Sequence, residues 1–180
     1  MPANNEPRFN PGAPAPQEIG RGRQAIALAG FLSLSLAAWA VASVPIILNS
    51  SGWFDGSVKA PWMPPGWMFR SMWTLLYVGV AVAAWLVWRK GALTGSTLAG
   101  YLIQLVLNAA WPLAFFGLFP VFGAAALWMA FVVIAGLASS LAFLILRFGP
   151  VSPIAGLLML PYLSWVVFSS SLNLYSAIHN

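Results

Sequence analysis

Five long apolar segments, separated by short polar connections, constrain this chain more than any other feature of its sequence. Each is close to the roughly 20 residues that a helix needs to cross the hydrocarbon core of a bilayer. Helices are expected because a lone apolar strand would leave its backbone N–H and C=O groups unpaired in lipid. We therefore predict an all-α integral membrane protein, a five-transmembrane-helix bundle, with spans at about residues 24–48, 67–88, 97–116, 121–146 and 153–175.

The composition supports a membrane setting. Hydrophobic residues make up 61% of the 180-residue chain and charged residues only 6%, whereas soluble domains carry roughly 25% charged residues. The lack of cysteine excludes disulfides, thiol catalysis and cysteine-bound metals. The net charge of +5 does not indicate a nucleic-acid partner, because the basic residues are dispersed at the ends of the apolar segments.

The N-terminal segment differs from the rest of the chain. Residues 1–22 are rich in Pro, Gly, Ala and Asn and show no hydrophobic periodicity, so we predict a disordered tail before a membrane domain at 23–180. A signal peptide is the alternative, with Arg21 and Arg23 as its basic part and Ala40-Val41-Ala42 as its cleavage site. The long polar stretch, and the apolar segment that continues past this site, favour the tail.

The charged residues between the spans predict their orientation. One side of a five-span protein carries Arg21, Arg23, Arg89, Lys90 and Arg147. The opposite side carries Lys59 and Arg70 together with Asp55. Because cytoplasmic loops hold the excess of Lys and Arg, we expect a cytoplasmic N-terminus and a first loop outside.

The first loop, at about 49–66, is the longest connection between spans. It is rich in aromatic residues and proline: Trp53, Phe54, Trp62, Pro64 and Pro65. Two interpretations stay open. The aromatic side chains can form a belt at the membrane interface, or the loop can fold back over the bundle as a lid, which consecutive prolines would stiffen.

Ionisable residues are lacking where several kinds of transporter need them. No Asp, Glu, Lys, Arg or His lies in the middle of a predicted span. Proton pumps and ion-coupled transporters need such groups at membrane depth, and five spans do not divide into two equal inverted repeats. The single histidine, His179, has no neighbouring residue with which to ligate a metal. We expect neither coupled transport, nor a metal site, nor an obligatory cofactor.

Prolines and small residues predict how the helices pack. Pro112 and Pro161 lie inside spans and are expected to kink them. Gly117–Pro120 predicts a tight turn that makes the third and fourth spans antiparallel neighbours. Two pairs of small residues four positions apart suit close helix packing, within the chain or in a homodimer: Gly79 with Ala83, and Gly136 with Ser140.

Neutral polar and aromatic residues recur at helical spacing on four of the spans. The sets are Trp39 and Ser43 on the first span, Trp73 and Tyr77 on the second, Tyr101, Gln104, Asn108, Trp111 and Phe115 on the third, and Tyr162, Trp165, Ser169 and Asn173 on the fifth. For any single residue the favoured interpretation is a hydrogen bond between helices, worth about 0.6 kcal/mol on average. Taken together, aromatic walls with a few amides describe a pocket for a flat apolar molecule.

Three ordered motifs carry a resemblance to a known family. The first is KAPWMPPGWMF at 59–69, followed by WTLLY at 73–77. The second is QLVLNAAW at 104–111, between Tyr101 and FFG at 115–117. The third is LPYLSWVVF at 160–168, followed by Leu172-Asn173. From about residue 24 to 180 the chain resembles the translocator protein (TspO/MBR) family, also called tryptophan-rich sensory proteins or peripheral benzodiazepine receptors.

The resemblance implies a five-helix bundle, usually dimeric, that binds porphyrins and sterol-like or benzodiazepine-like molecules under a first-loop lid. The matching pocket positions are Trp73, Asn108, Trp111, Trp165 and Ser169, and the matching lid positions are Trp62, Pro64, Pro65 and Trp67. Some bacterial members are associated with light-driven breakdown of protoporphyrin. The tryptophans that match Trp73 and Trp165 are implicated in that reaction.

Two departures from the family pattern affect the expected ligands. Arg70 and Ser71 stand where many members have glycine and proline. With Lys59, Arg70 could pair with porphyrin propionates; the alternative is an ordinary arginine at a helix end. The cholesterol-recognition pattern of animal members is incomplete after Tyr175, so we do not expect tight sterol binding.

From these observations we predict a membrane receptor or carrier that binds a porphyrin, such as protoporphyrin IX or a haem-like tetrapyrrole, inside the bundle. A photo-oxidative porphyrin-degrading enzyme, with Trp73 and Trp165 as candidate catalytic residues, is one alternative; a modulatory subunit of a larger membrane complex is another. The candidate ligand-binding residues are Trp39, Trp62, Pro64, Pro65, Trp67, Trp73, Tyr77, Gln104, Asn108, Trp111, Tyr162, Trp165 and Ser169, with Lys59 and Arg70 for propionates.

Overall fold

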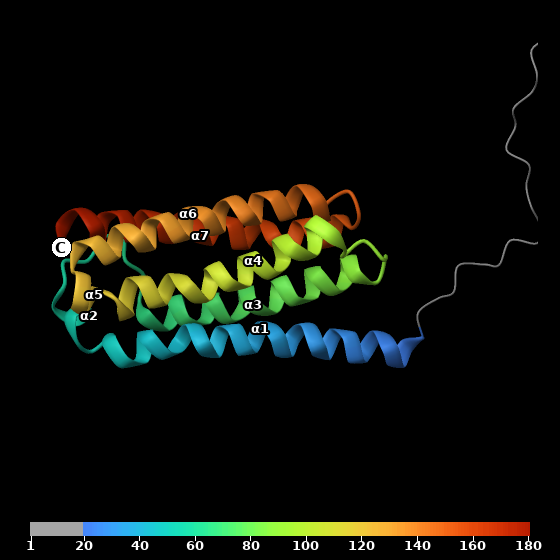
Figure 1. The fold of residues 1–180 in the computed structure, drawn as a ribbon, viewed down its shortest axis with the longest axis horizontal. Helices are drawn as coiled ribbons and strands as arrows, with labels where there is room; N and C mark the ends of the chain where they lie inside the picture. Colours follow the sequence, from blue (N-terminus) through green and yellow to red (C-terminus); the bar gives the residue numbers. More distant parts are fainter. Residues whose placement is uncertain (1–19) are drawn as a thin grey trace, which may run out of the picture.

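The computed structural model describes residues 20–180, and in that part of the chain five helices are long and apolar enough to cross a membrane (Figure 1). They are α1 (Arg21–Asn49), α3 (Gly66–Trp88), α4 (Gly95–Pro112), α6 (Ala124–Phe148) and α7 (Pro153–His179). Shorter elements connect them: α2 (Trp53–Gly56), the π-helix η1 (Leu113–Gly117) and α5 (Phe119–Phe122). The predicted all-α membrane-spanning bundle is confirmed.

The predicted spans agree with these helices to within a few residues, but the turn between the third and fourth spans was misplaced. Phe119–Phe122 forms one helical turn, and the chain enters α6 at Gly123, whose φ is +56°. Glycine adopts this conformation without the steric penalty that a side chain would bring. The two spans are neighbours as expected, since α4 packs against α6. Of the predicted tail, residues 1–19 lie outside the described residues.

The end of the third span changes from α-helix to π-helix. Pro112 closes α4, and η1 follows directly. Proline has no backbone N–H to donate, and the backbone then widens so that the Leu118 N–H donates to the Leu113 carbonyl at 3.0 Å. The wide turn leaves two consecutive aromatic residues, Phe115 and Phe116, both buried. By contrast α7 continues as one helix through Pro161.

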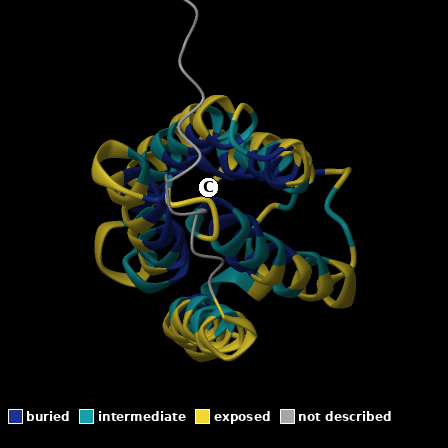
Figure 2. Ribbon diagram, turned by 90° about the vertical axis from the view of Figure 1, so that its right-hand side faces the viewer, coloured by how far each residue is buried: buried dark blue, intermediate teal, exposed yellow. Residues whose placement is uncertain are grey.

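The first helix is the least embedded of the five. Seen along the bundle in Figure 2, α1 lies at the bottom and is mostly exposed or intermediate, whereas the other helices turn buried faces towards one another. Along α1 only Ser35, Ala42 and Pro45 are buried. It packs on α3, α4 and η1. Its outer side chains are apolar, which suits contact with lipid rather than water.

Small residues let the remaining helices approach closely within one chain. A Cβ atom on Gly79 would lie 3.9 Å from the backbone of Leu158 on α7, and one on Gly136 would lie 3.7 Å from Leu107 on α4. The hydroxyl of Ser140 donates to the Gly100 carbonyl of α4 at 3.3 Å. The small-residue pairs that hinted at a homodimer are therefore used for packing inside the chain.

Candidate functional site

A cavity of about 530 Å³ lies between the helices beneath the first loop. Its volume falls within the roughly 300–1,000 Å³ of sites that bind drug-sized ligands. Residues from α1, α2, the first loop, α3, α4, η1 and α7 line it. They are Trp39, Ala42, Ser43, Ile46, Ile47, Ser50, Phe54, Lys59, Met63, Pro64, Gly66, Phe69, Arg70, Trp73, Tyr77, Asn108, Trp111, Pro112, Phe115, Phe116, Ser169, Leu172 and Asn173.

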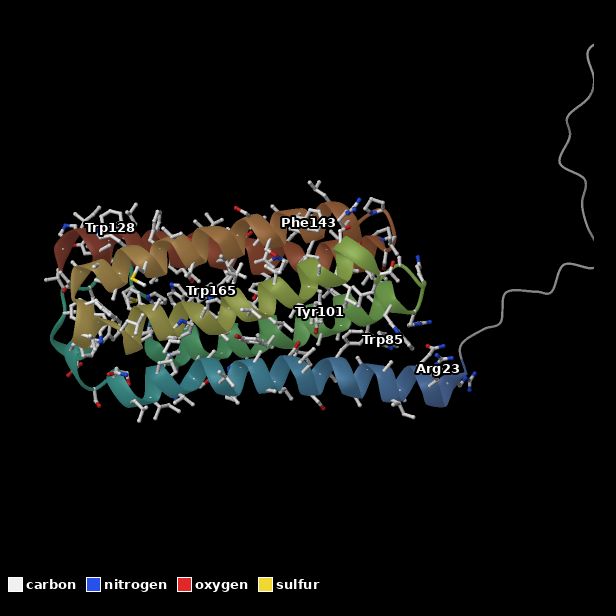
Figure 3. The ribbon with its side chains drawn as sticks, in the orientation of Figure 1. Arg23, Trp85, Tyr101, Trp128, Phe143 and Trp165 are labelled. Atoms are coloured by element: carbon white, nitrogen blue, oxygen red, sulfur yellow. The ribbon has the colours of Figure 1, made fainter. Side chains whose placement is uncertain are left out.

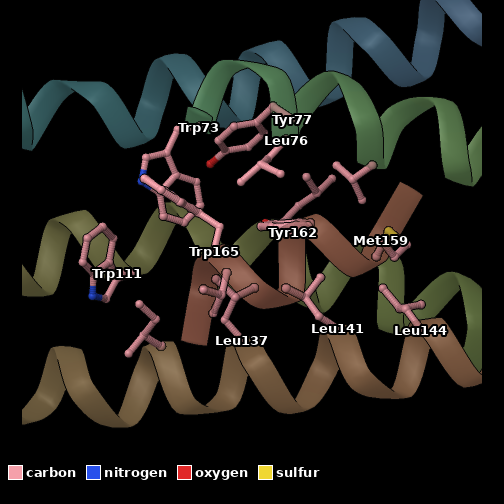
Figure 4. Close-up of a cluster of buried hydrophobic side chains, with 14 of the residues drawn as sticks. Trp73, Leu76, Tyr77, Trp111, Leu137, Leu141, Leu144, Met159, Tyr162 and Trp165 are labelled. Atoms are coloured by element: carbon pink, nitrogen blue, oxygen red, sulfur yellow. The ribbon is translucent and has the colours of Figure 1, made fainter. Parts of the chain in front are cut away.

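Aromatic rings form much of the cavity wall. The indoles of Trp73 and Trp111 stack with their ring centroids 5.8 Å apart and their planes 25° apart. Tyr77 lies one turn along α3 from Trp73, at 6.4 Å, and Phe115 lies 5.6 Å from Trp111. Figure 4 shows Trp73 and Tyr77 projecting from α3 towards the aromatic side chains of α7. Rings at such distances favour a flat apolar occupant that can pack against their faces.

Three residues of the wall also carry polar atoms that are not hydrogen-bonded. The indole nitrogen of Trp73, the hydroxyl of Tyr77 and the hydroxyl of Ser169 are buried and have no hydrogen-bond partner among the described residues. Nearly all buried polar groups in proteins have a partner, and leaving one unpaired costs roughly 1–3 kcal/mol. Each of these groups therefore keeps a hydrogen-bonding capacity that the described part of the protein does not use.

Other polar residues of the predicted faces bond helices to each other. The Trp111 indole donates to the Asn173 side-chain oxygen at 2.9 Å, and the Asn173 amide donates to the Leu127 carbonyl of α6 at 2.9 Å. These two bonds join α4, α7 and α6. They also fix the orientation of the Trp111 ring, which lines the cavity.

A second set of polar contacts joins α4 to α7. The Asn108 amide donates to the Tyr162 hydroxyl, and that hydroxyl donates to the Gln104 side-chain oxygen at 3.2 Å. Gln104 and Tyr162 are buried and lie outside the cavity wall. For these two residues the interhelical hydrogen bond is the role that the structure supports.

Two cations stand at the side of the cavity that the first loop covers. Lys59 and Arg70 are the charged residues among those that line it. The Lys59 ammonium donates to the Asp55 carbonyl at 2.7 Å and lies 5.1 Å from the centre of the Phe54 ring. Arg70, near the start of α3, is exposed. An otherwise uncharged cavity therefore has a positively charged edge.

The structure brings together part of the predicted site. The cavity is lined by Trp39, Lys59, Pro64, Arg70, Trp73, Tyr77, Asn108, Trp111 and Ser169. Trp62, Pro65, Trp67, Gln104, Tyr162 and Trp165 do not line it. Trp62 bonds to the end of α7, Pro65 caps the start of α3, and Trp67 is 69% exposed. For the residues that line the cavity and for those that do not, ligand binding stays a prediction.

Trp165 sits behind the cavity wall. It is buried between the helices, whereas Trp128 of α6 lies on the outside of the bundle (Figure 3). The ring centroid of Trp165 is 5.6 Å from that of Phe69. Phe69 itself lines the cavity and also contacts Trp73 and Trp111. A ligand in the cavity therefore meets Phe69 before it meets Trp165.

Several wall residues were missed by the sequence argument. Phe69 lies one turn before Trp73 inside the quoted motif, and Phe54 belongs to the aromatic first loop, so their positions gave a usable signal. Met63 is a neighbour of Pro64 in the same motif. Aliphatic wall residues such as Ile46 and Leu172 carry no signal, because apolar residues occur all round a membrane helix.

Comparison with known proteins places this arrangement in a family. The model of the TspO/MBR family matches residues 31–178. The chain is 34% identical to human translocator protein over 125 residues, which cover 67% of this chain and 70% of that protein. It is 35% identical to tryptophan-rich protein TspO of Chlorobaculum tepidum over 159 residues, covering 84% and 94%.

A third relative has a name that points to sensing. The chain is 33% identical to tryptophan-rich sensory protein of Cereibacter sphaeroides over 143 residues, which cover 79% of this chain and 86% of the relative. The family match, at residues 31–178, includes most or all of each of the five membrane-spanning helices. The chain therefore belongs to the TspO/MBR family and is a multi-pass integral membrane protein.

Proposed function

We propose that this protein is a membrane receptor or carrier that binds a porphyrin, or another flat apolar ligand, in the cavity beneath the first loop. Membership of the TspO/MBR family supports a membrane receptor- or transporter-type role. The observation that carries the porphyrin proposal is the cavity itself, in which the stacked indoles of Trp73 and Trp111 form part of the wall and cations stand at one edge.

The wall chemistry matches the two parts of a porphyrin. The macrocycle is broad, flat and apolar, and aromatic faces such as Trp73 and Trp111 gain from both stacking and removal of apolar area from water. The propionates are anionic. Lys59 and Arg70, which line the cavity at the first-loop side, would supply charge-assisted hydrogen bonds to them. Trp73, Tyr77 and Ser169 retain unused polar atoms for further contacts.

The proposal includes a topology and an assembly. Arg89, Lys90 and Arg147 lie at the end of the bundle opposite to the first loop. The positive-inside rule supports a cytoplasmic location for that end and an external location for the cavity mouth. A homodimer is proposed on the family resemblance alone.

Saturable quenching of tryptophan fluorescence tests the binding proposal. Protoporphyrin IX is titrated into the full chain in lipid nanodiscs, and Trp73→Phe and Asn108→Ala are compared with the wild type. We expect one saturable phase whose Kd rises about ten-fold or more in both variants, which is the loss of roughly 1.4 kcal/mol. Trp128→Phe is the matched control, because Trp128 is exposed on the outer side of α6. Unchanged affinity in both cavity variants would contradict the site.

A light-driven enzyme is the second candidate, favoured by the position of Trp73 on the cavity. Its indole lies in the wall with an unbonded N–H and stacks on a second indole at 5.8 Å. An excited porphyrin in the cavity would be in contact with an oxidisable side chain. Illumination of the complex separates the candidates: a defined new absorption band in the wild type that is lost in Trp73→Phe favours the enzyme, and uniform bleaching in both favours a receptor or carrier.

A further inference from the structure

Three polar side chains behind the cavity wall are buried between the helices and have no hydrogen-bond partner among the described residues. The atoms concerned are the hydroxyls of Ser35 and Tyr101 and the side-chain nitrogen of Gln104. The exposed fractions of these residues are 1%, 0% and 0%, and none of the three lines the cavity. Because nearly all buried polar groups in proteins have a partner, the three atoms need one that the chain does not supply.

The three side chains lie in one neighbourhood, where α1 packs on α4. Tyr101 and Gln104 are three residues apart and share a face of α4. The Tyr101 ring reaches α1, where it packs edge-on against Phe31 with centroids 5.8 Å apart. One turn further along α1, the Ser35 hydroxyl faces that of Tyr101, but the two do not meet the geometry of a direct hydrogen bond. The Tyr101 hydroxyl is also close enough to that of Tyr162 for an electrostatic interaction.

The neighbouring hydrogen bonds determine which role Gln104 has left to fill. The Asn108 amide donates to the Tyr162 hydroxyl. That hydroxyl donates its own hydrogen to the Gln104 side-chain oxygen at 3.2 Å. With this oxygen occupied, the Gln104 amide nitrogen remains as a donor, and it needs an acceptor.

Neither bulk solvent nor lipid can satisfy these groups at their depth. Ser35 is the middle residue of α1, Arg21–Asn49, and is buried. Lipid chains offer no hydrogen bond, and a buried side chain does not reach bulk water. A bound water molecule can accept from the Gln104 N–H and also bond to both hydroxyls, and buried waters typically make about three hydrogen bonds.

We propose that ordered water binds among Ser35, Tyr101 and Gln104 and joins α1 to α4 near the middle of the membrane. The water accepts from the Gln104 side-chain nitrogen and bonds to the two hydroxyls. Together with the bonds of Asn108 and Tyr162, it completes a hydrogen-bonded path from the cavity wall to α1. This site is separate from the cavity, and its existence does not depend on the proposed function.

X-ray radiolytic labelling of the full chain in lipid nanodiscs tests for this water. The pulse splits water into hydroxyl radicals, which oxidise the nearest side chains, and mass spectrometry identifies each oxidised residue. Tyr101 should be labelled in spite of its burial, because its ring lies next to the bound water. Phe148 of α6 is the matched control, since its ring is equally buried, with an exposed fraction of 0%, and carries no polar atom. We expect several-fold more labelling at Tyr101 than at Phe148.

Removal of one partner gives a second readout. Ser35→Ala takes away a group that holds the water, so both the labelling of Tyr101 and the thermal unfolding midpoint should fall. Tyr101→Phe should lower the midpoint as well. A hydroxyl without any partner predicts the opposite sign, because its removal relieves the cost of burying an unpaired polar group. Ser139→Ala is the control, since the Ser139 hydroxyl bonds within its own helix on the exposed side of α6.

The outcomes distinguish bound water from its alternatives. Labelling of Tyr101 no higher than that of Phe148 would overturn the water site, and lower midpoints in both variants would then indicate a direct bond between Ser35 and Tyr101. Higher midpoints in both variants would show that the hydroxyls are unpaired, which also overturns the site. Labelling of Tyr101 that is unchanged in Ser35→Ala would exclude Ser35 as a partner of the water and, with it, the proposed link to α1.

Discussion

The Trp111 indole nitrogen and the Asn173 side-chain oxygen are 2.9 Å apart, and this bond fixes a cavity-wall ring to the helix that faces it. The same Asn173 side chain donates to the Leu127 carbonyl at 2.9 Å. One amide thus serves three helices. Its two bonds make the side chain of Asn173 one of the connections between the cavity wall and the core of the bundle.

Removal of that amide should destabilise the protein and loosen the site. Asn173→Ala leaves both the Trp111 N–H and the Leu127 carbonyl unpaired. Interhelical hydrogen bonds in membranes average about 0.6 kcal/mol each, so we expect a loss of about 1–2 kcal/mol, measured by thermal unfolding in detergent. Ser139→Ala, on the exposed side of α6, should leave the unfolding midpoint unchanged; an equal loss in both would refute the role given to Asn173.

The cations at the cavity edge should recognise the carboxylates of a porphyrin and not its ring. Lys59→Gln and Arg70→Gln should each weaken binding of protoporphyrin IX by up to about five-fold, since an exposed ion pair contributes roughly 0.2–1 kcal/mol. Protoporphyrin dimethyl ester has the same macrocycle without the charges, and its Kd should not change. A comparable loss with the ester would show that these side chains act by packing alone.

The Trp53 indole compensates for a proline. In a continuous α-helix the Phe116 carbonyl would accept from residue 120, which is Pro120 and has no N–H. The Trp53 indole supplies the missing donor at 3.1 Å. Trp53→Phe keeps most of the ring but leaves the carbonyl unpaired, so we expect a loss of about 1–2 kcal/mol in unfolding free energy.

A second substitution checks this explanation of Trp53. Pro120→Ala restores a backbone N–H at the position that would pair with the Phe116 carbonyl in a continuous α-helix. In the double variant, part of the stability lost in Trp53→Phe should return, and a double-mutant cycle from thermal unfolding measures the coupling. Purely additive losses would mean that Trp53 stabilises the protein through its ring contacts and not through the bond to the Phe116 carbonyl.

Close packing at the start of α7 makes Gly156 sensitive to a single methyl group. A Cβ at this position would lie 2.9 Å from the Gly149 Cα, a backbone atom that cannot move aside cheaply. We expect Gly156→Ala to cost about 1–3 kcal/mol, as other overpacked substitutions do. Gly30→Ala is the control, because a Cβ on Gly30 of α1 has nothing within 4 Å. That variant should be neutral or more stable, owing to alanine's higher helix propensity.

The sequence predicted the number and type of the helices because membrane thickness fixes the length of an apolar segment. Several residues chosen because residues three or four apart share a helix face, including Trp73, Asn108 and Trp111, line the cavity, and ligand binding there stays a prediction. Spacing alone does not show which way that face points relative to the other helices. Gln104 and Asn108 share one face of α4, yet only Asn108 lines the cavity.

Backbone irregularities were beyond the reach of pattern arguments. The predicted turn at Gly117–Pro120 ignored a short helix and the role of Gly123, because the polar turn residues that mark such a connection are lacking there. The tryptophans of the first loop and of the start of α3 divide in a way that composition does not reveal. Trp53 stacks on Phe119, Trp62 bonds to Ser171 of α7, and Trp67 is exposed.

Because α1 is the least buried of the five helices, its packing depends on whether the cavity is occupied. Trp39, Ile46 and Ile47 of this helix line the cavity, whereas few of its other side chains are buried against the neighbouring helices. A bound molecule that contacts these side chains and the facing indoles would hold α1 against the other four helices. Hydrogen exchange along α1 should therefore slow on loading, which would make the N-terminal helix the segment that reports a filled cavity.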